Sequence, residues 1–259
     1  MVEEFTDVLF GIDGPVATLM LNRPAKLNAV TPGMTDAVRR YADRVNADSQ
    51  IRTVILAGAG ERAFCAGSDV GELDAYSTAW EFRGRPDYCD AIRSIRKPVI
   101  AAVNGYAYGG GLELAMSADI RLASRTAMFA APEIKLGWIG GGGASAFLAL
   151  SAGPSNAALM LYTGDPVDAT TALSWGLVSQ VLEPPELLPA ARELAGRIAQ
   201  RPPIAAQTAK LNLRAAYGMT LENAIQYERD LQTICFATED AAEGRAAFTQ
   251  KRPPRFRGR

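Results

Sequence analysis

Histidine is absent from the 259 residues of this sequence. That absence excludes Ser-His-Asp and Cys-His activation of a nucleophile, together with every metal site that depends on imidazole ligands. Any acid–base chemistry must therefore come from Asp, Glu, Lys, Tyr or Cys. Cysteine is scarce, because only Cys65, Cys89 and Cys235 occur and they form no CxxC pair. We interpret them as reduced thiols of a cytoplasmic protein rather than as a disulfide framework or a zinc site.

Long apolar runs and a strong net charge are missing too. No apolar stretch approaches the ~18 residues needed to span a bilayer, so we expect no membrane association. The acidic start of the chain lacks a basic segment followed by an apolar one, and we therefore expect no signal peptide. The formal net charge of −1 offers no general attraction to nucleic acid. Hydrophobic residues make up 48% and charged residues 21%, which is typical of a globular protein.

Two kinds of periodicity divide the chain. Short runs rich in valine and isoleucine predict strands at residues 16–21, 53–57, 99–103, 120–123 and 177–182. Helical patterns predict helices from residue 34 onward, at 155–162, 168–175, 186–200, 204–217, 221–236 and 239–248. Strands thus alternate with helices up to about residue 182, and only helices follow. This order predicts an α/β core with a C-terminal helical subdomain.

A glycine triplet at residues 109–111 opens a strand-to-helix turn within VNGYAYGGGLELAMSADI. Glycine lets backbone amides face a ligand, and a helix N-terminus presents free N–H groups with a partial positive charge. Leu114 stands where a GxGxxG dinucleotide motif needs glycine, and Gly110 is followed by Gly111 where a P-loop needs lysine. Both nucleotide motifs fail, which favours a site for a developing oxyanion.

Glu113 follows the triplet in an otherwise apolar run. A lone glutamate in a first helical turn most often only complements the helix dipole. Its neighbours Leu112, Leu114 and Met116 argue for a function instead, because burying a charge needs a reason. We expect the helix field to keep this carboxylate ionised.

Two further segments add an amide donor and a carboxylate. AFCAGSDVGEL, residues 63–73, places the Ser68 amide and a predicted helix N-cap, Asp69, after a strand. FAAPEIKLGWIGGGGAS, residues 129–145, carries Glu133 after a proline and ahead of four glycines. Each segment alone is compatible with an ordinary turn, but together the three segments supply two amides and two carboxylates.

These motifs resemble those of the crotonase family, the enoyl-CoA hydratase/isomerase superfamily. The resemblance covers essentially the whole chain and includes LNRPAKLNAV, AFCAGSDVGEL, KPVIAAVNGYAYGGGLELAMSADI, APEIKLGWIG, LYTGDPVDA, WGLVSQV and AAFTQKR. It implies an α/β fold, a right-handed spiral of ββα units with a C-terminal helical trimerisation region. We accordingly divide the chain into a spiral core with the CoA and acyl site, residues 1–195, and a helical subdomain for oligomerisation, residues 196–259.

The resemblance also implies a site for an acyl-CoA thioester. The amides of Ser68 and Gly110 would form an oxyanion hole, and Glu113 and Glu133 would be the catalytic carboxylates. The residues expected to line the CoA or the acyl chain are Ala25, Lys26, Leu27, Ala66, Asp69, Trp138, Gly141, Phe248 and Lys251. The last two would come from a neighbouring subunit of a homotrimer or homohexamer. No metal is expected, and no cofactor beyond the CoA of the substrate.

Three departures from the family pattern bear on this site. Gly71 stands where some hydratases carry a lysine that contacts CoA, and Gly140-Gly141 replaces Pro-Gly after Glu133. Trp138 replaces a small polar residue, and it either reshapes the acyl pocket or packs in the core. Five basic residues lie between the motifs: Arg83, Arg85, Arg93, Arg96 and Lys97. We interpret them as a solvated helix face, and the alternative is a patch that meets the CoA phosphates.

The leading functional hypothesis is an enoyl-CoA hydratase, in which Glu133 transfers a proton at the α-carbon and Glu113 holds the water. A double-bond isomerase, which needs mainly Glu133, and a specialised hydroxyacyl-CoA dehydratase are the alternatives. An RNA-binding homologue is a hypothesis of another class, because five of the last nine residues are Lys or Arg. A tail that caps a neighbouring subunit is favoured over it. Cys65 is interpreted as a small buried hydrophobe rather than a nucleophile.

Overall fold

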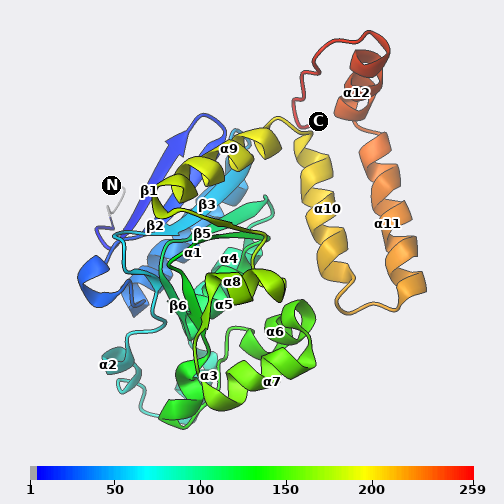
Figure 1. Ribbon diagram of the computed structural model, residues 1–259. Helices are drawn as coiled ribbons and strands as arrows, with labels where there is room; N and C mark the ends of the chain where they lie inside the picture. The colour runs from blue at the N-terminus through cyan, green and yellow to red at the C-terminus, as the bar shows by residue number, and fades with distance from the viewer. Residues whose placement is uncertain (1–4) are drawn as a thin grey trace.

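The computed structural model in Figure 1 describes residues 5–259. Residues 1–4 lie outside the described residues. They belong to the start of the chain, which we do not expect to be a signal peptide. The described strands form one sheet of six strands and another of four. Helices pack around these sheets, and the C-terminal helices α10, α11 and α12 extend away to one side (Figure 1).

The six-stranded sheet is the centre of the core. Its order is β1 (Val8–Asp13), β2 (Val16–Leu21), β3 (Thr53–Gly58), β5 (Val99–Val103), β7 (Ile120–Ser124) and β10 (Gln180–Leu182). β1 pairs antiparallel with β2, and all later neighbours are parallel. β3 and β5 are buried along their whole length, as parallel strands covered on both faces must be. Four of the predicted strands are confirmed here almost to the residue.

The predicted strand over residues 177–182 is correct only for its last three residues. The Leu177 amide donates to Ala172 O at 2.8 Å, at the end of α8 (Ala169–Ser174), and is therefore not available to the sheet. Leu177 is fully buried all the same. Its apolar character reflects a packed loop rather than strand pairing.

The four-stranded sheet consists of strands too short for a sequence pattern to predict. They are β4 (Ala63–Cys65), β6 (Tyr106–Tyr108), β8 (Met128–Ala130) and β9 (Val167–Asp168). β4, β6 and β8 run parallel, and β9 closes the sheet antiparallel. The successive pairs β3–β4, β5–β6 and β7–β8 each give one strand to each sheet, which is the repeating ββα arrangement that the resemblance implied.

Helices cover both faces of the large sheet. α1 (Pro32–Ala47), α4 (Tyr88–Ser94) and α5 (Gly110–Ser117) contact one another in series on one side. α9 (Leu187–Ala199) covers the other side with Leu187, Ala191 and Ala195. Along β3, Val54 and Leu56 join the first cluster, whereas Ile55 and Ala57 join the second. This alternation follows from the two-residue period of a strand.

Shorter elements connect these layers. The helices are α2 (Val70–Leu73), α3 (Ala79–Gly84), α6 (Ala144–Ala152) and α7 (Pro154–Thr163), and the 3₁₀ turns are η1 (Pro24–Lys26), η2 (Pro132–Leu136) and η3 (Pro184–Glu186). α6 begins at the end of the glycine-bearing segment 129–145, and no helix was predicted there. α7 and α8 confirm the helices predicted at 155–162 and 168–175.

The C-terminal helices are α10 (Pro203–Ala215), α11 (Leu221–Phe236) and α12 (Glu239–Thr249), and they agree closely with the predicted ranges. The expected division at residues 195/196 lies inside α9, which packs as a unit on the sheet. Lys210 ties α10 to the core: it is 4% exposed, and its Nζ lies 2.7 Å from Asp119 Oδ2 and 2.9 Å from Lys97 O. No helix within residues 5–259 is both long and apolar enough to cross a bilayer.

Candidate active site

Ser68 and Gly110 are brought together by the four-stranded sheet. β4 and β6 run parallel side by side, so the residues that follow them meet at one edge. A Cβ on Gly67, whose φ is +102°, would stand 3.1 Å from Gly110 N. No described residue accepts a hydrogen bond from the Ser68 or Gly110 amide. The turn therefore presents two free N–H donors next to each other.

The segment around η1 holds the Ser68 turn from the other side. Val30 N donates to Gly67 O at 2.8 Å, and Asp69 N donates to Val30 O at 2.9 Å. Ala66 N donates to Leu27 O at 3.0 Å. Leu27, the last of the residues 25–27 expected along the CoA, therefore lies beside Ala66.

Asn28 and Arg23 position this segment, although sequence reasoning singled out neither. Asn28 is fully buried, and its Nδ2 donates to Ala59 O at 3.0 Å and Ala63 O at 2.8 Å. Arg23 Nη1 contacts Asp69 Oδ2 at 3.1 Å. Asp69 does occupy the position before α2, but its side chain makes no capping bond there, because it pairs with Arg23 instead.

Glu113 lies in the first turn of α5 and is 5% exposed. Its Oε1 accepts hydrogen bonds from Gly142 N at 2.7 Å and Ala144 N at 3.1 Å. Ala144 is the first residue of α6. The carboxylate is thus held by the N-terminus of a second helix as well as lying near the N-terminus of its own, which favours its negative charge.

The glycines at 140 and 142 make room for this carboxylate. A Cβ on Gly140 would stand 2.5 Å from Glu113 Oε1, and one on Gly142 would stand 2.8 Å from Oε2. Arg93 fixes the run through Gly142 O at 2.6 Å and also donates to Ser117 Oγ at 3.0 Å. The interpretation of the basic group as a solvated face is wrong for Arg93, which is drawn inward by these acceptors.

The same interpretation is wrong for Lys97, which is 5% exposed and donates from Nζ to Val45 O at 2.6 Å. Backbone carbonyls at the end of α1 compensate for the burial of its charge. Sequence patterns could not separate these two cations from their exposed neighbours, because the acceptors come from segments distant in the chain.

Glu133 approaches the same turn from η2. A Cβ on Gly109, whose φ is +56°, would stand 2.9 Å from Glu133 Oε1. Glu133 Oε2 is buried and has no hydrogen-bond partner among the described residues. A buried polar atom without a partner is costly, so this oxygen is suited to an interaction with a bound molecule. Both glutamates therefore flank the glycine triplet that carries Gly110.

Burial dominates the electrostatics of the two glutamates. It raises the pKa of Glu113 above its ordinary value of 4.5; the amide bonds from Ala144 and Gly142 offset part of the rise, and the nearby charge of Glu133 adds to it. Burial also raises the pKa of Glu133. Desolvation therefore outweighs the amide bonds in setting the direction of the Glu113 pKa shift, while the expectation that the helix field keeps this carboxylate ionised stays a prediction.

The remaining expected residues are less closely grouped. Trp138 is 43% exposed, so the interpretation that it packs in the core is wrong. Its amide donates to Glu133 O at 3.2 Å, which keeps it close to η2. Gly141 is exposed, and a Cβ added there would stand 3.8 Å from Arg85 Nη2. Phe248, 87% exposed, and Lys251 belong to the α12 region, far from α5 in the same chain (Figure 1).

Cys65 lies next to the oxyanion turn and is fully buried, and burial raises the pKa of its thiol to about 12. A thiol with so high a pKa stays protonated near neutral pH and is a poor nucleophile. The interpretation of Cys65 as a small buried hydrophobe is confirmed. Within residues 5–259 there is no group of three or more His, Cys, Asp or Glu side chains that could hold a metal ion.

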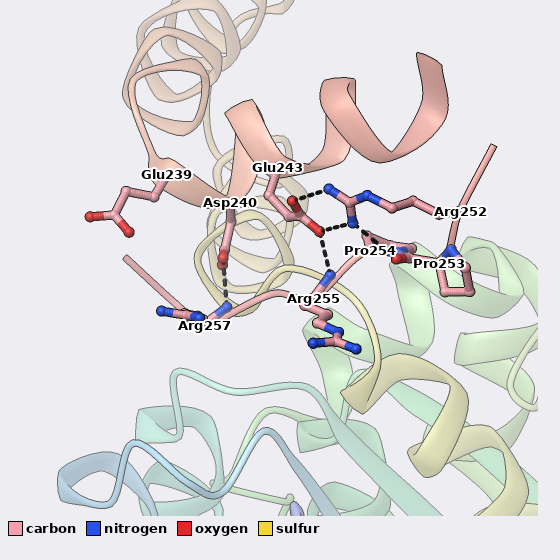
Figure 2. A pocket seen from close by; sticks show the side chains of 8 residues that line it. All are labelled: Glu239, Asp240, Glu243, Arg252, Pro253, Pro254, Arg255 and Arg257. Atoms are coloured by element: carbon pink, nitrogen blue, oxygen red, sulfur yellow. Dashed lines mark hydrogen bonds and ion pairs between the residues drawn. The ribbon is translucent and has the colours of Figure 1, made fainter. Parts of the chain in front are cut away.

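Two cavities lie outside the glutamate pair. One of about 260 Å³ opens beside Ser68 and is lined also by Val30, Leu73, Tyr76 and Tyr88. A larger one of about 800 Å³ lies between α12 and the C-terminal tail (Figure 2). The larger cavity is remote from the glutamates, so volume alone does not indicate the active site.

The charged groups of the larger cavity pair with one another. Figure 2 shows Glu243 between Arg252 and the Arg255 amide. The Glu243 carboxylate accepts from Arg252 at 2.6 and 2.7 Å and from Arg255 N at 2.8 Å. Arg259 contacts Glu239 at 2.8 Å. Two cations of the tail are thus neutralised within the chain, which favours a packed tail over a free basic arm.

A family model described as enoyl-CoA hydratase/isomerase matches residues 11–259. The chain belongs to the enoyl-CoA hydratase/isomerase family. It is 36% identical over 255 residues to the short-chain-enoyl-CoA hydratase of Clostridium acetobutylicum, covering 96% of this chain and 97% of the relative. It is 39% identical to the mitochondrial enoyl-CoA hydratase of Pongo abelii, covering 95% and 85%.

Solved structures show the same fold. An enoyl-CoA hydratase subunit from Geobacillus kaustophilus superposes with a TM-score of 0.94 at 36% identity, covering 99% of this chain and all of the other. The enoyl-CoA hydratase of Bacillus anthracis gives a TM-score of 0.91 at 31% identity, covering 98% and 100%. The α/β fold class expected from the resemblance is confirmed, and the chain is an enzyme of the hydratase/isomerase family. Nothing in these likenesses shows the trimerisation region.

We predict that Gly142→Ala displaces the Glu113 carboxylate, because the new Cβ would stand 2.8 Å from Oε2 and 3.0 Å from Cys89 Sγ. A misplacement of about 1 Å at a reacting group costs on the order of 10²-fold in rate. We expect kcat for an enoyl-CoA to fall by about that factor. Gly11→Ala is the matched control, since nothing lies within 4 Å of its added Cβ. Wild-type kcat in Gly142→Ala would contradict the role of the glycine run.

The raised pKa values predict the acidic limb of the pH–rate profile. A carboxylate that acts as a base must be ionised, so if Glu113 is that base, kcat/KM should rise with pH through a pKa above the ordinary 4.5. The stability consequence has the opposite sign, because ionising a buried carboxyl lowers the free energy of unfolding as pH rises from 4.5 through the raised pKa. Glu113→Gln should therefore gain in Tm relative to wild type across that window. An acidic limb at or below pH 4.5 would contradict this prediction.

Proposed function

We propose that the protein is an enoyl-CoA hydratase, which adds water reversibly to the double bond of a 2-enoyl-CoA thioester. The observation that carries this proposal is the pairing of the buried Glu113 with Glu133, whose Oε2 is buried, around a turn with two free amides. Relatives of this chain are named short-chain-enoyl-CoA hydratase and crotonyl-CoA hydratase, each at 36% identity. These names support the same reaction.

The amides of Ser68 and Gly110 would hold the thioester oxygen as negative charge develops on it. Preorganised amide donors gain most when the charge forms, and losing one typically costs about 10²–10³ in rate. Both donors are backbone groups, so their side chains affect the reaction only through geometry. Gly110 begins α5, and the helix N-terminus adds its partial positive charge at that point.

The two carboxyls differ in how the protein holds them, which supports different roles. Glu113 Oε1 is fixed by two amides, so Oε2 can orient and deprotonate a water molecule that attacks the β-carbon. Glu133 Oε2 has no partner among the described residues and can carry the proton that is delivered to the α-carbon. One well-placed acid or base contributes roughly 10²–10⁴-fold. Dehydration of a hydroxyacyl-CoA is the same sequence reversed.

No cofactor beyond the substrate's own CoA is part of this proposal, because the amides and carboxyls supply the oxyanion, base and acid contacts. We place residues 25–27, which include Lys26, along the CoA together with Ala66. We place Trp138 near the acyl chain. The exposed side chain of Trp138, adjoining η2, supports that placement. The free thiols Cys65, Cys89 and Cys235 support a cytoplasmic location, where thiols stay reduced.

The C-terminal helices support assembly into a homotrimer or homohexamer. The exposed large apolar side chains of these helices and of the loop between α10 and α11 are Leu211, Leu213, Tyr217, Met219, Leu221, Ile234, Phe236 and Phe248. A monomer would leave this surface in water, whereas an oligomer would bury it. In such an assembly Phe248 and Lys251 would meet the CoA bound to a neighbouring subunit.

We predict that light scattering on the purified protein at micromolar concentration gives the mass of a trimer or hexamer. Replacing Leu213 and Phe236 with glutamate should shift the protein toward monomers, because two charges would then have to be buried in the interface. Leu9→Glu, at an exposed apolar position of β1, is the control for added charge. A stable wild-type monomer would refute the assembly.

The proposed function is tested by Glu113→Gln and Glu133→Gln, which preserve volume and hydrogen bonding but remove proton exchange. With crotonyl-CoA, each variant of a hydratase should lose at least ~10²-fold in kcat with a modest change in KM. The double variant should be little slower than the worse single, because the two groups act in one step.

Other outcomes separate the alternatives. For an isomerase, Glu133→Gln should be severe and Glu113→Gln mild, measured on a 3-enoyl-CoA. If neither change slows turnover of any enoyl-CoA or hydroxyacyl-CoA that the wild type processes, the two carboxyls are not the catalytic pair. Circular dichroism and Tm establish that each variant is folded.

A further inference from the structure

Tyr88 contacts both residues that carry the oxyanion amides, yet the reaction described above gives it no role. It is the first residue of α4 and is 7% exposed. It also lines the cavity of about 260 Å³ that opens beside Ser68.

The Tyr88 hydroxyl lies between Ser68 and Gly110. Tyr88 Oη is 3.1 Å from Ser68 Oγ, within hydrogen-bond distance. On its other side the hydroxyl lies against Gly110, where an added Cβ would overlap Oη. One hydroxyl group therefore touches both residues of the oxyanion turn, although they follow different strands.

The base of the Tyr88 side chain is firmly held. Asp87 caps α4, and its Oδ1 accepts from Cys89 N at 2.6 Å and Asp90 N at 3.3 Å. Cys89 Sγ adds a long contact to Gly110 O at 3.9 Å. The start of α4 is thus fixed relative to the start of α5, and the ring of Tyr88 has little freedom.

Ser68 depends on the Tyr88 hydroxyl more than Gly67 and Asp69 do. The backbone bridge to Val30 uses Gly67 O and Asp69 N, and leaves the Ser68 amide free for a ligand. Among the described residues, Tyr88 Oη is the hydrogen-bond partner of Ser68 Oγ. The turn is therefore anchored on both sides of Ser68 by backbone, and at Ser68 itself by the tyrosine.

The chemistry of the Tyr88 hydroxyl excludes a role as a base. Burial raises the pKa of Tyr88 well above its usual range, and the nearby Cys89, Cys65 and Glu113 add to the rise, while the bond to Ser68 lowers it only in part. The phenol therefore stays protonated near neutral pH. Its contribution is a hydrogen bond and a contact, not proton transfer.

We propose that Tyr88 is a positioning residue of the oxyanion hole, whose hydroxyl, bonded to Ser68 Oγ and packed on Gly110, sets the spacing of the two amides. The proposal rests on the proposed function in that the thioester oxygen is the atom these amides would hold. A ligand oxygen needs both donors at hydrogen-bond distance at once, so a small change in spacing weakens one of them.

Kinetics of Tyr88→Phe, Ser68→Ala and the double variant with crotonyl-CoA test the proposal. Neither change removes an amide, so we expect each to lower kcat about 10-fold, less than the 10²–10³ for outright loss of a donor. KM should change little, because the oxyanion contact strengthens in the transition state. The double variant should be no slower than Tyr88→Phe, since both changes break one contact. Wild-type kcat in Tyr88→Phe, or additive losses in the double variant, would overturn the proposal.

A spectroscopic measurement distinguishes positioning from a merely structural role. Bound hexadienoyl-CoA should absorb at longer wavelength than the free thioester when the amides polarise its carbonyl. We expect this red shift to shrink in Tyr88→Phe and Ser68→Ala. Tyr41→Phe is the matched control, because Tyr41 stacks on Phe10 with ring centroids 4.6 Å apart, away from the site. A lowered Tm in Tyr88→Phe with an unchanged red shift would overturn the proposal.

The outcomes separate this proposal from the proposed function. A wild type that hydrates crotonyl-CoA alongside an unaffected Tyr88→Phe refutes the role of Tyr88 alone. A wild type that binds hexadienoyl-CoA with a red shift but hydrates no enoyl-CoA refutes the hydratase, while the shift in the variants still decides the role of Tyr88. A wild type that binds no acyl-CoA refutes both.

Discussion

The Glu113 carboxylate lies at the N-terminus of α6, where its Oε1 accepts hydrogen bonds from Gly142 and Ala144. Burying a carboxylate is costly unless donors compensate, and this requirement shapes the surrounding segments. α6 must begin against α5, and the chain before it must carry glycine where a side chain would strike the carboxylate. Arg93 from α4 then holds the carbonyl side of that same glycine run. The two amide bonds to Glu113 and the Arg93 bond together fix three helices and one loop.

The glycine triplet meets a similar constraint at three consecutive positions. At 109 the missing side chain admits the Glu133 carboxyl, at 110 it admits the Tyr88 hydroxyl, and at 111 it admits the backbone of Cys65. The triplet therefore does more than free one amide for a ligand. It lets two acidic or hydroxylic groups and a neighbouring strand reach the same turn at once, which concentrates the chemistry in a small volume.

This crowding has an electrostatic consequence. Burial raises the pKa of both carboxyls, and the nearby charge of Glu133 adds to the rise at Glu113, so each is easier to protonate than a surface glutamate. A carboxyl with a raised pKa takes up a proton more readily than an ordinary glutamate, which suits a proton-transfer role. The cost to stability is met elsewhere, by a large sheet that is buried on both faces and by polar anchors such as Asn28 and Lys210.

The sequence by itself determined the fold class and most of the long strands and helices, and it predicted the two glutamates and two amide donors that the structure brings to one turn. Those features are local patterns or specific motifs, and both can be recognised along the chain. Only the tertiary structure decided that Arg93 and Lys97 point inward, that Trp138 is exposed, and that burial outweighs the amide bonds in shifting the pKa of Glu113. The contact of Tyr88 with Ser68 and Gly110 was likewise decided only by the tertiary structure. Each depends on acceptors, neighbours or solvent exclusion contributed by segments far apart in sequence, and no periodicity within one segment carries that information.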